Sequence, residues 1–343
     1  MERQETTYRK YLLITLTAMV LLLAAIVSLV YVADPYQQFR PSDRYINNAR
    51  MEIPGVSRHH DYNAALMGSS MAMNNDHHLV DSLFSKPGEP WKTRNFTLIG
   101  GMSDDFDVIL PRLRKDGKVR HIIFDLDFFS FGRKQNTIQP FLYSDNYFDK
   151  LKYIFNYTTL KDCYTKYSMH WVEDSIYHFN NANSKEILVE NYKKAIVQPL
   201  KMEGYDFSFE HLKEAFEHDL MVHVEAMKEV DWYIYFPPYS AFEFVRYKDE
   251  GNWPDIFRFK TYVCQRLLSC ENVRLYDFQT DDSYVMALSE YMDIRHFTHA
   301  FNDRIITEIS ENKGRLNRDN YQERIDLLNQ KVLVLDADSL MKQ

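Results

Sequence analysis

The hydrophobic pattern of the chain begins with one long uncharged run. Residues 11–32 carry no charge, and Leu, Ile, Val, Ala and Met dominate them. A transmembrane helix needs about 20 such residues, so the run is long enough to cross a bilayer. A cleaved signal peptide is the alternative, but its apolar core would be about 7–15 residues long, which is shorter than this run. We therefore expect an uncleaved membrane anchor over residues 11–32.

Beyond the anchor, short apolar runs alternate with stretches in which apolar residues recur at helical spacing. The short runs predict strands over residues 62–67, 95–99, 119–126, 232–236 and 273–276. The helical spacing predicts helices over residues 104–115, 209–230 and 299–312. Strands that alternate with helices are typical of βαβ units, so we expect an α/β fold with a parallel sheet. A last apolar run at 332–335 predicts an edge strand.

The remaining segments set the expected domain boundaries. Turn signals at Asp34-Pro35 and Pro54-Gly55 predict a juxtamembrane connector. The stretch from 133 to 207 is rich in Tyr, Phe, Asn and Lys and has no strong strand pattern, which predicts a mostly helical insertion. We expect a cytoplasmic tail over 1–10, the anchor over 11–32, the connector over 33–60, an α/β domain over 61–314 with the insertion at about 133–230, and a C-terminal extension over 315–343.

Charge and composition narrow the class of function. The chain has 343 residues and a formal net charge of −8, whereas phosphate binding needs clustered Lys and Arg, so we expect no nucleic-acid partner. Its three cysteines form no disulfide framework and no CxxC pair, and we expect neither a metal nor a cofactor. Glycine is scarce, with ten residues against the roughly 24 of average usage. The position of each glycine is therefore informative.

The charges that flank the anchor are nearly balanced. Three basic residues precede it within residues 1–10, and three follow it within residues 33–50. The usual excess of cytoplasmic Lys and Arg therefore gives little direction. A short N-terminal tail before a single apolar segment usually stays in the cytoplasm, so we expect residues 33–343 on the extracytoplasmic side of a cell membrane.

Candidate chemistry lies at the expected carboxyl ends of the strands, where parallel sheets carry their sites. The first strand ends in Gly68-Ser69-Ser70, where Ser70 can present its hydroxyl beside the start of a helix. The second strand ends in Gly100-Gly101, whose bare backbone can offer an N–H to an oxyanion. The segment 237–240 follows the fourth strand and is expected to form a wall of the pocket. Each glycine motif alone is more often a plain turn.

A third motif pairs a carboxylate with a histidine. Asp293 lies three residues before His296, and of the twelve histidines only His296 has an aspartate at this spacing. Such an aspartate can accept the ring N–H and leave the other nitrogen free to take a proton from a serine. The plainer interpretation is a capping aspartate next to a surface histidine.

Taken together and in order, the three motifs resemble those of the SGNH/GDSL hydrolase superfamily. Gly68-Ser69-Ser70 stands where that superfamily has Gly-Asp-Ser, Gly100-Gly101 stands at its second block, and Asp293 with His296 stands at its last block. The resemblance implies a flavodoxin-like three-layer sandwich, with Ser70 as nucleophile, His296 as base and Asp293 orienting it. It also implies an oxyanion hole of backbone N–H groups from Ser70 and from Gly100 or Gly101.

This sequence departs from the superfamily at the third block, which normally supplies an Asn. Residues 124–129 read Phe-Asp-Leu-Asp-Phe-Phe instead, and an ionised Asp cannot donate to an oxyanion. The departure leaves a catalytically inactive binding or assembly protein as an alternative. A metal-dependent hydrolase that uses His59-His60 and His77-His78 together with His296 and His299 is a third hypothesis.

Within the superfamily, the anchor and the Gly-Ser-Ser motif look most like membrane-anchored proteins of bacterial surface-polymer clusters, such as the teichoic-acid D-alanyl transfer proteins. This resemblance implies a serine esterase or O-acyltransferase at the cell membrane. Its substrate would be a cell-surface polysaccharide, an acylated glycan or a teichoic-acid-like polymer. A membrane acyltransferase is the candidate protein partner.

Overall fold

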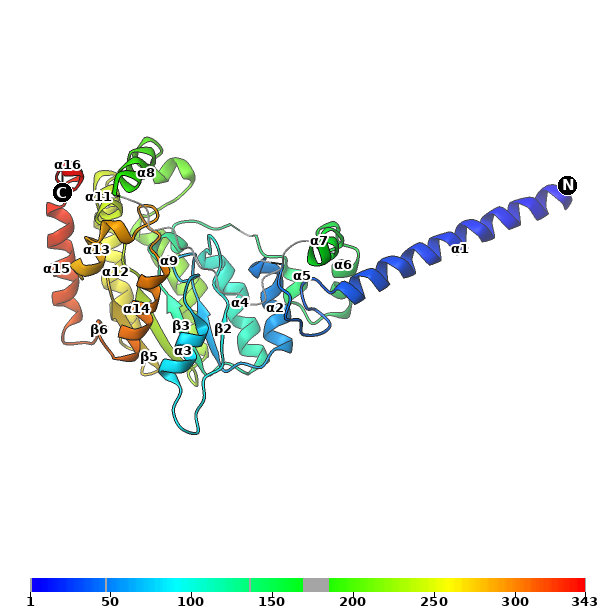
Figure 1. Cartoon of the computed structure of the whole chain (residues 1–343), viewed down its shortest axis with the longest axis horizontal. Coiled ribbons are helices and arrows are strands. Elements are labelled where there is room, and N and C mark those ends of the chain that lie inside the picture. Colours follow the sequence, from blue (N-terminus) through cyan, green and yellow to red (C-terminus); the bar gives the residue numbers. More distant parts are fainter. Residues whose placement is uncertain (1, 47, 136, 169–184, 343) are drawn as a thin grey trace. The chain divides into compact units, whose positions relative to one another are not determined.

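The computed structural model describes residues 2–46, 48–135, 137–168 and 185–342, and it divides the chain into two compact units. The first unit contains Met1–His60 and Ile138–Ser175, and the second contains Asp61–Thr137 and Ile176–Gln343. The segment expected to form one helical insertion is thus shared between the two units (Figure 1).

The second unit is built on a six-stranded sheet. The strand order is β2-β1-β3-β4-β5-β6, with bounds β1 Ala64–Met67, β2 Thr93–Asn95, β3 His121–Asp125, β4 Asp231–Phe236, β5 Val273–Asp277 and β6 Arg315–Leu316. The strands from β2 to β5 are parallel to their neighbours, and β6 runs antiparallel to β5. The expected α/β class is therefore confirmed, and the sheet is mostly parallel, whereas a parallel sheet was predicted.

Most strands lie where the apolar runs predicted them. Every residue of β1 is buried, as expected for a parallel strand with helices on both faces of its sheet. Strand β2 ends at Asn95 instead of covering the predicted 95–99, because the Asn95 side chain accepts the Thr97 amide and bends the chain. The backbone nevertheless stays beside β1, since the Phe96 amide donates to the Leu66 carbonyl at 2.8 Å.

Helices cover the sheet on both faces. The chain steps from β1 to β2 in one direction along the sheet and then proceeds in the other through β3, β4 and β5. Right-handed crossovers therefore put the first helix on one face and the later helices on the other. Apart from four helical elements over residues 209–226 and 321–334, the helices of this unit are α3 His77–Phe84, α4 Ser103–Asp116, η1 Phe128–Phe131, α8 Lys185–Val197, η2 Leu200–Glu203, α11 Ala241–Asp249, α12 Trp253–Leu267, α13 Asp282–Val285, η4 Leu288–Glu290, α14 His299–Ser310 and α16 Ala337–Lys342.

Two predicted elements differ from those in the structure. The run predicted over 209–230 is α9 Phe209–Phe216, a π-helical turn η3 Glu217–Met221, and α10 Val222–Ala226. The edge strand predicted at 332–335 is wrong, because this segment lies in and just after α15 Tyr321–Val334. Ile325, Leu328 and Val332 form one buried helical face there, and the short strand β6 takes the edge of the sheet instead.

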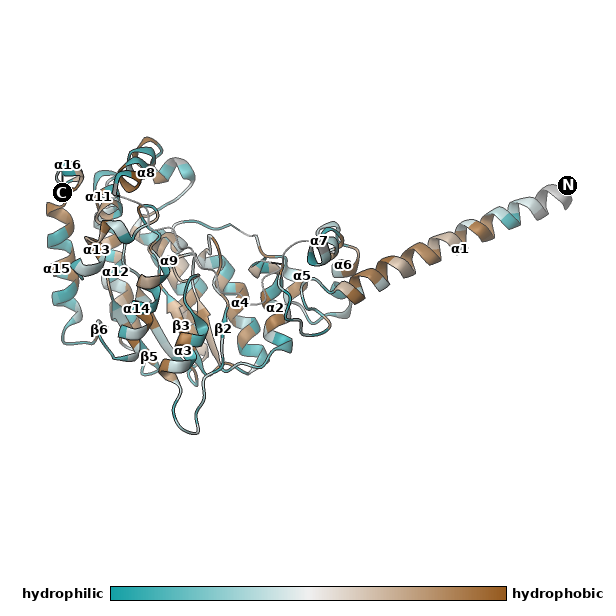
Figure 2. Ribbon diagram, viewed as in Figure 1, coloured by the Kyte–Doolittle hydropathy of each residue, from teal (hydrophilic) through white to brown (hydrophobic). Residues whose placement is uncertain are grey.

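The first unit consists of helices. They are α1 Glu2–Ala33, α2 Ala49–His59, α5 Pro140–Tyr143, α6 Tyr147–Ile154 and α7 Tyr157–Ser168. Over Thr7–Ala33, α1 is long and apolar enough to cross a membrane, and Figure 2 shows the hydrophobic colouring along this part of the helix. The predicted apolar helix is thus present, and it begins before the predicted anchor, within the expected tail.

The last turn of α1 is embedded in the core of the first unit. Val30 and Ala33 pack with Leu142, Tyr153 and Cys163. The turn predicted at Pro54-Gly55 is wrong, because both residues lie inside α2. A Cβ at Gly55 would stand 2.1 Å from the Tyr36 carbonyl oxygen, so this glycine lets α2 approach the connector backbone closely.

Candidate active site

The segment that follows β1 forms a tight turn beside the end of β3. Gly68 has φ of +142°, and a Cβ there would lie 2.5 Å from Asp125 Cβ, so no larger residue fits. The helix start predicted next to Ser70 is wrong, because α3 begins only at His77. Instead, the Ala72 amide donates to the Ser69 carbonyl at 3.2 Å, and the chain continues through further turns.

Ser70, His296 and Asp293 form a continuous chain of hydrogen bonds. Ser70 Oγ lies 2.7 Å from His296 Nε2, and His296 Nδ1 lies 2.7 Å from Asp293 Oδ2. The serine and histidine are 226 residues apart in the sequence, so the fold alone brings them together. These distances and this order are those of a nucleophile, a base and an orienting acid.

Asp293 is fixed by its own turn. Its Oδ1 accepts the backbone amides of Arg295 and His296, each at 2.8 Å. Burial alone would raise the pKa of Asp293, but the hydrogen bond and charge of His296, together with these two amides, lower it to about 2. Asp293 is therefore ionised at neutral pH, which holds the proton of His296 on Nδ1 and leaves Nε2 to accept.

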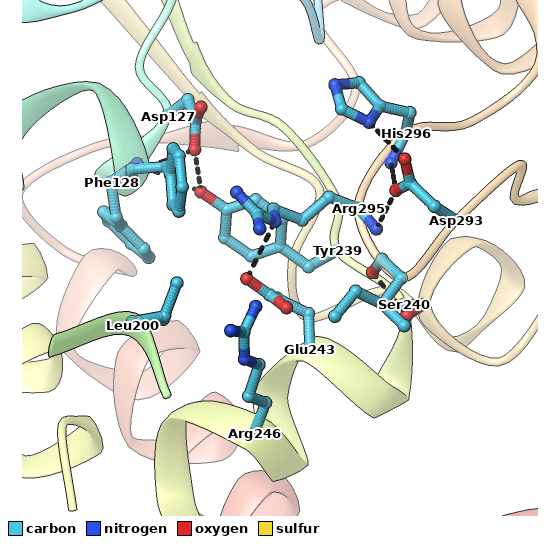
Figure 3. A network of polar contacts seen from close by, with 12 residues as sticks. Asp127, Phe128, Leu200, Tyr239, Ser240, Glu243, Arg246, Asp293, Arg295 and His296 are labelled. Carbon is cyan, nitrogen blue, oxygen red and sulfur yellow. Dashed lines mark hydrogen bonds and ion pairs between the residues drawn. The ribbon is translucent and has the colours of Figure 1, made fainter. Parts of the chain in front are cut away.

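Contacts with Ser240 and Glu243 attach the loop that carries Asp293 and His296 to the rest of the second unit (Figure 3). The Ser240 hydroxyl donates to the Ile294 carbonyl at 2.6 Å. The Arg295 guanidinium lies 3.0 Å from a carboxylate oxygen of the buried Glu243 and 3.8 Å from the centre of the Phe129 ring. The charge of Arg295 is thus neutralised by a carboxylate of α11, and its side chain fixes the backbone on which His296 sits.

A pair of buried aspartates lies below the Ser70 turn. The Ser69 hydroxyl oxygen is 3.0 Å from Asp125 Oδ2 and 3.1 Å from Asp127 Oδ2. The Ser69 amide also donates to Asp125 Oδ2 at 3.3 Å, and one hydroxyl hydrogen serves two close carboxyl groups best when one of them is protonated. Burial, followed by the charge of Asp127, raises the pKa of Asp125 well above its usual range, so Asp125 is the protonated partner. Ser69 is thereby held from two sides, next to Ser70.

Asp127 is the acceptor of this pair. Its Oδ1 accepts the Phe129 amide at 3.1 Å and the hydroxyl of Tyr239 (Figure 3). Tyr239 belongs to the segment 237–240 that was expected to form a wall of the pocket. In the structure its side chain is fully buried and lies outside the cavity lining, so that expectation is wrong. Tyr239 supports the aspartate pair instead.

A cavity of about 410 Å³ opens in front of Ser70. All five residues predicted for the site line it, namely Ser70, Gly100, Gly101, Asp293 and His296. The cavity lies at the end of β1 and β3, the point where the strand order reverses, which is where open α/β sheets bind their ligands.

The expected oxyanion hole is only partly available in this geometry. The Ser70 amide has no acceptor among the described residues, so it is ready to donate. The Gly101 amide donates to the Leu98 carbonyl at 3.0 Å and is therefore engaged. Two side chains that can donate, Arg133 and Gln135, line the same cavity, in place of the absent Asn.

Sequence reasoning missed the residues that the predicted insertion brings to the cavity. Arg133 and Tyr205 line it, and the Arg133 guanidinium lies 4.4 Å from the centre of the Tyr205 ring. Tyr205 in turn packs against Phe129, with ring centres 3.9 Å apart. One glycine of this scarce residue type, Gly132, was the only signal in the sequence for this contact. A Cβ at this position would stand 3.0 Å from the Tyr205 ring, so the close approach of Tyr205 requires a glycine.

The histidines considered for a metal have other partners. His60 Nε2 lies 2.7 Å from Gln37 Oε1, and the ring centres of His77 and His78 are 4.2 Å apart. Among the described residues, one group has metal-ligand spacing, formed by Asp107, His218 and Asp219. The oxygens of Asp219 already accept from the Ser103 hydroxyl and contact His218, each at 2.6 Å.

Comparisons of the chain with protein-family models, with curated proteins and with solved structures find no match. The chemistry of the site therefore follows from its own geometry. A serine hydroxyl bonded to an oriented imidazole, at the mouth of a cavity, can attack an acyl carbonyl.

Proposed function

We propose that this protein is a membrane-anchored, extracytoplasmic serine esterase or O-acyltransferase of the SGNH type. The observation that carries the proposal is the hydrogen-bonded chain from Ser70 through His296 to Asp293, which opens into a cavity. The order β2-β1-β3-β4-β5 supports it, because flavodoxin-like sheets have this order. Helix α1 would anchor the chain, with residues 33–343 outside the cytoplasm.

The reaction has two steps. His296 Nε2 takes the hydroxyl proton as Ser70 Oγ attacks the ester carbonyl, and the amide of Ser70 donates to the developing oxyanion. The imidazolium then returns the proton to the leaving alcohol as the ester bond breaks, which leaves an acyl group on Ser70. In the second step, water or a polymer hydroxyl gives its proton to His296 Nε2 and attacks the acyl carbonyl. The bond between the acyl group and Ser70 Oγ then breaks, and the imidazolium returns the proton to Ser70 Oγ.

The cationic groups of the cavity lining favour an anionic substrate. The rings of Phe129 and Tyr205 face each other, and their other sides are covered by the guanidinium groups of Arg295 and Arg133, so the rings hold these two cations at the cavity. Arg295 is neutralised by Glu243, whereas Arg133 has no carboxylate within ion-pair distance among the described residues. An unneutralised guanidinium favours a substrate with phosphate or carboxylate groups. We therefore favour a teichoic-acid-like polymer or an acidic glycan, with an acetyl or D-alanyl group transferred.

A fluorophosphonate probe tests the nucleophile directly. The full-length chain in membranes should be labelled, and Ser70→Ala should lose all labelling because the probe reacts only with an activated serine. Ser82→Ala is the matched control, since Ser82 lies on the exposed side of α3 and donates only to the Leu79 carbonyl. If the native chain is not labelled under conditions where a reference serine hydrolase reacts, the result contradicts the proposal that this protein is an enzyme.

The second candidate function is a catalytically inactive binding or assembly protein for the same polymer system. The engaged amide of Gly101 favours it, because a tetrahedral intermediate would then have fewer donors. Restoration of polymer acylation in a deletion strain distinguishes the two candidates. Ser70→Ala and His296→Ala should restore it only if the protein acts without catalysis.

A further inference from the structure

The exposed side of α6 carries an apolar stripe in the first unit. Its members are Tyr147, Phe148, Leu151 and Phe155, with exposed fractions of 78, 71, 43 and 47%. At 3.6 residues per turn, these four positions fall on one arc of about 100°. A helix of a water-soluble protein buries an arc of this width against its core. Here the core of the unit takes Tyr153, on a different side of the same helix.

The outward side of α7 has a similar character. Tyr157 and Tyr164 have exposed fractions of 80 and 76%, and exposed Lys161 lies between them on the same side of the helix. Tyrosine, phenylalanine and lysine together are typical of surfaces at the level of lipid headgroups, where an amphipathic ring or a long cationic chain has one end in each medium.

Both helices contact the end of the apolar span. Tyr153 of α6 and Cys163 of α7 pack with Val30 and Ala33 in the last turn of α1. The Tyr167 hydroxyl of α7 donates to the Val32 carbonyl at 3.4 Å, and the guanidinium of Arg40 donates to the same oxygen. The Val32 carbonyl at the end of α1 thus accepts from two polar side chains, which satisfies one of the carbonyl groups that a helix end leaves without a partner inside the helix.

We propose that α6 and α7 lie on the membrane surface, with the stripe Tyr147, Phe148, Leu151 and Phe155 inserted among lipid headgroups. The lipid bilayer is the occupant, because the stripe belongs to the unit that contains the proposed anchor α1, beside the turn at which α1 ends, and the inference rests on that anchoring. The first unit then contacts the membrane through the surface of α6 and α7 as well as through α1. This inference is independent of the catalytic proposal, since the stripe residues lie outside the lining of the Ser70 cavity.

Nitroxide depth measurements on the full-length chain test the proposal. The chain is reconstituted in nanodiscs of phosphatidylcholine and phosphatidylglycerol, in a Cys270→Ser background, because the other two cysteines are buried. Labels are placed at Phe148→Cys and Tyr157→Cys. Val20→Cys on the exposed apolar surface of α1 gives the hydrocarbon reference, and Lys86→Cys, exposed on the second unit, gives the aqueous reference.

The expected result is fewer collisions with a water-soluble nickel chelate at both test positions than at the aqueous reference, with collision rates between those of the two references. Nickel accessibility equal to that of the Lys86→Cys label would overturn the proposal. Labels that are exposed to nickel in nanodiscs but immobilised in native membranes would also overturn it, because a protein partner would then cover the stripe. All four substituted side chains are exposed, and an unchanged trypsin digestion pattern verifies that each variant is folded.

Discussion

Asp34 in the first unit and Asp293 in the second are carboxylates held in the same way. Asp34 accepts the backbone amides of residues 38–40 at 2.8–3.1 Å, and Asp293 accepts the amides of residues 295 and 296. Each carboxylate then holds one ring. The hydroxyl of Tyr153 donates to Asp34 at 2.9 Å, as His296 Nδ1 does to Asp293 at 2.7 Å.

The two rings differ in what surrounds them. Tyr153 is buried in the core that closes around the end of α1, and burial raises its pKa, so it remains a neutral phenol. His296 faces a cavity and has Ser70 as its second partner. The same local turn chemistry is therefore structural in one unit and suited to proton transfer in the other. A carboxylate–ring pair is structural where the ring is enclosed in a core, and it is suited to proton transfer where the ring faces a cavity.

The largest expected effect tests the second unit. Asp293→Asn should lower ester hydrolysis by roughly 10²- to 10⁴-fold, because the amide no longer fixes the proton of His296 on Nδ1. The wild-type pKa of about 2 keeps Asp293 ionised over pH 5–9, so the loss should be equal across that range. Initial rates on an activated ester check this. A loss that disappears at high pH would contradict the assigned role.

The stability contribution of Asp293 has a defined pH dependence. Because its folded pKa lies below the unfolded value of about 3.9, the contribution is fully present above pH 3.9 and is lost as pH falls through about 2. At neutral pH the Asp293→Asn variant should therefore be slightly less stable than the native chain, while the fold of the sheet is retained.

Substitution of Asp34, the equivalent carboxylate of the first unit, should lower stability and leave the reactivity of Ser70 unchanged. Asp34→Ala leaves several buried donors without an acceptor, at a cost of about 1–3 kcal/mol. We expect faster proteolysis of residues 33–60 and an unchanged rate of probe labelling at Ser70. Loss of labelling in this variant would break the comparison, since it would show that the two units share one cooperative structure.

A smaller effect concerns the aspartate pair below Ser70. Asp125→Asn should keep most of the labelling, because a neutral amide replaces a carboxyl that is already protonated. The raised pKa of Asp125 makes its stability contribution greatest below about pH 3.9, and the contribution is lost as pH rises towards the folded pKa. Relative to the native chain, the free energy of unfolding of the variant should therefore rise by up to about 1.4 kcal/mol for each pH unit between pH 3.9 and the folded pKa of Asp125.

Asp127→Asn is the matched control for this prediction. Asp127 accepts from Tyr239, Phe129 and Ser69, so its conversion to an amide replaces an acceptor with a donor and should lower stability. Thermal unfolding of both variants and of the native chain over pH 5–9 measures the difference. Equal behaviour of the two variants would contradict the assignment of the proton to Asp125.

The sequence predicted the elements that depend on local pattern. The apolar runs located β1, β3, β4 and β5 because parallel strands are buried on both faces. It failed for Pro54-Gly55 and for 332–335, where contacts with other segments override local signals. A close approach to Tyr36 explains the glycine inside α2, and the buried face of α15 explains the run that resembled a strand.

The apolar helix, the α/β class and the three short motifs could be predicted from the amino-acid sequence, because each depends on residues close together in the chain. The contact of Ser70 with His296, the hydrogen bond of the Gly101 amide and the positions of Arg133 and Tyr205 in the cavity lining required the folded chain. These outcomes depend on the strand order, which sets which loops share one edge of the sheet. Strand order arises from long-range packing, and a one-dimensional pattern of polar and apolar residues does not contain it.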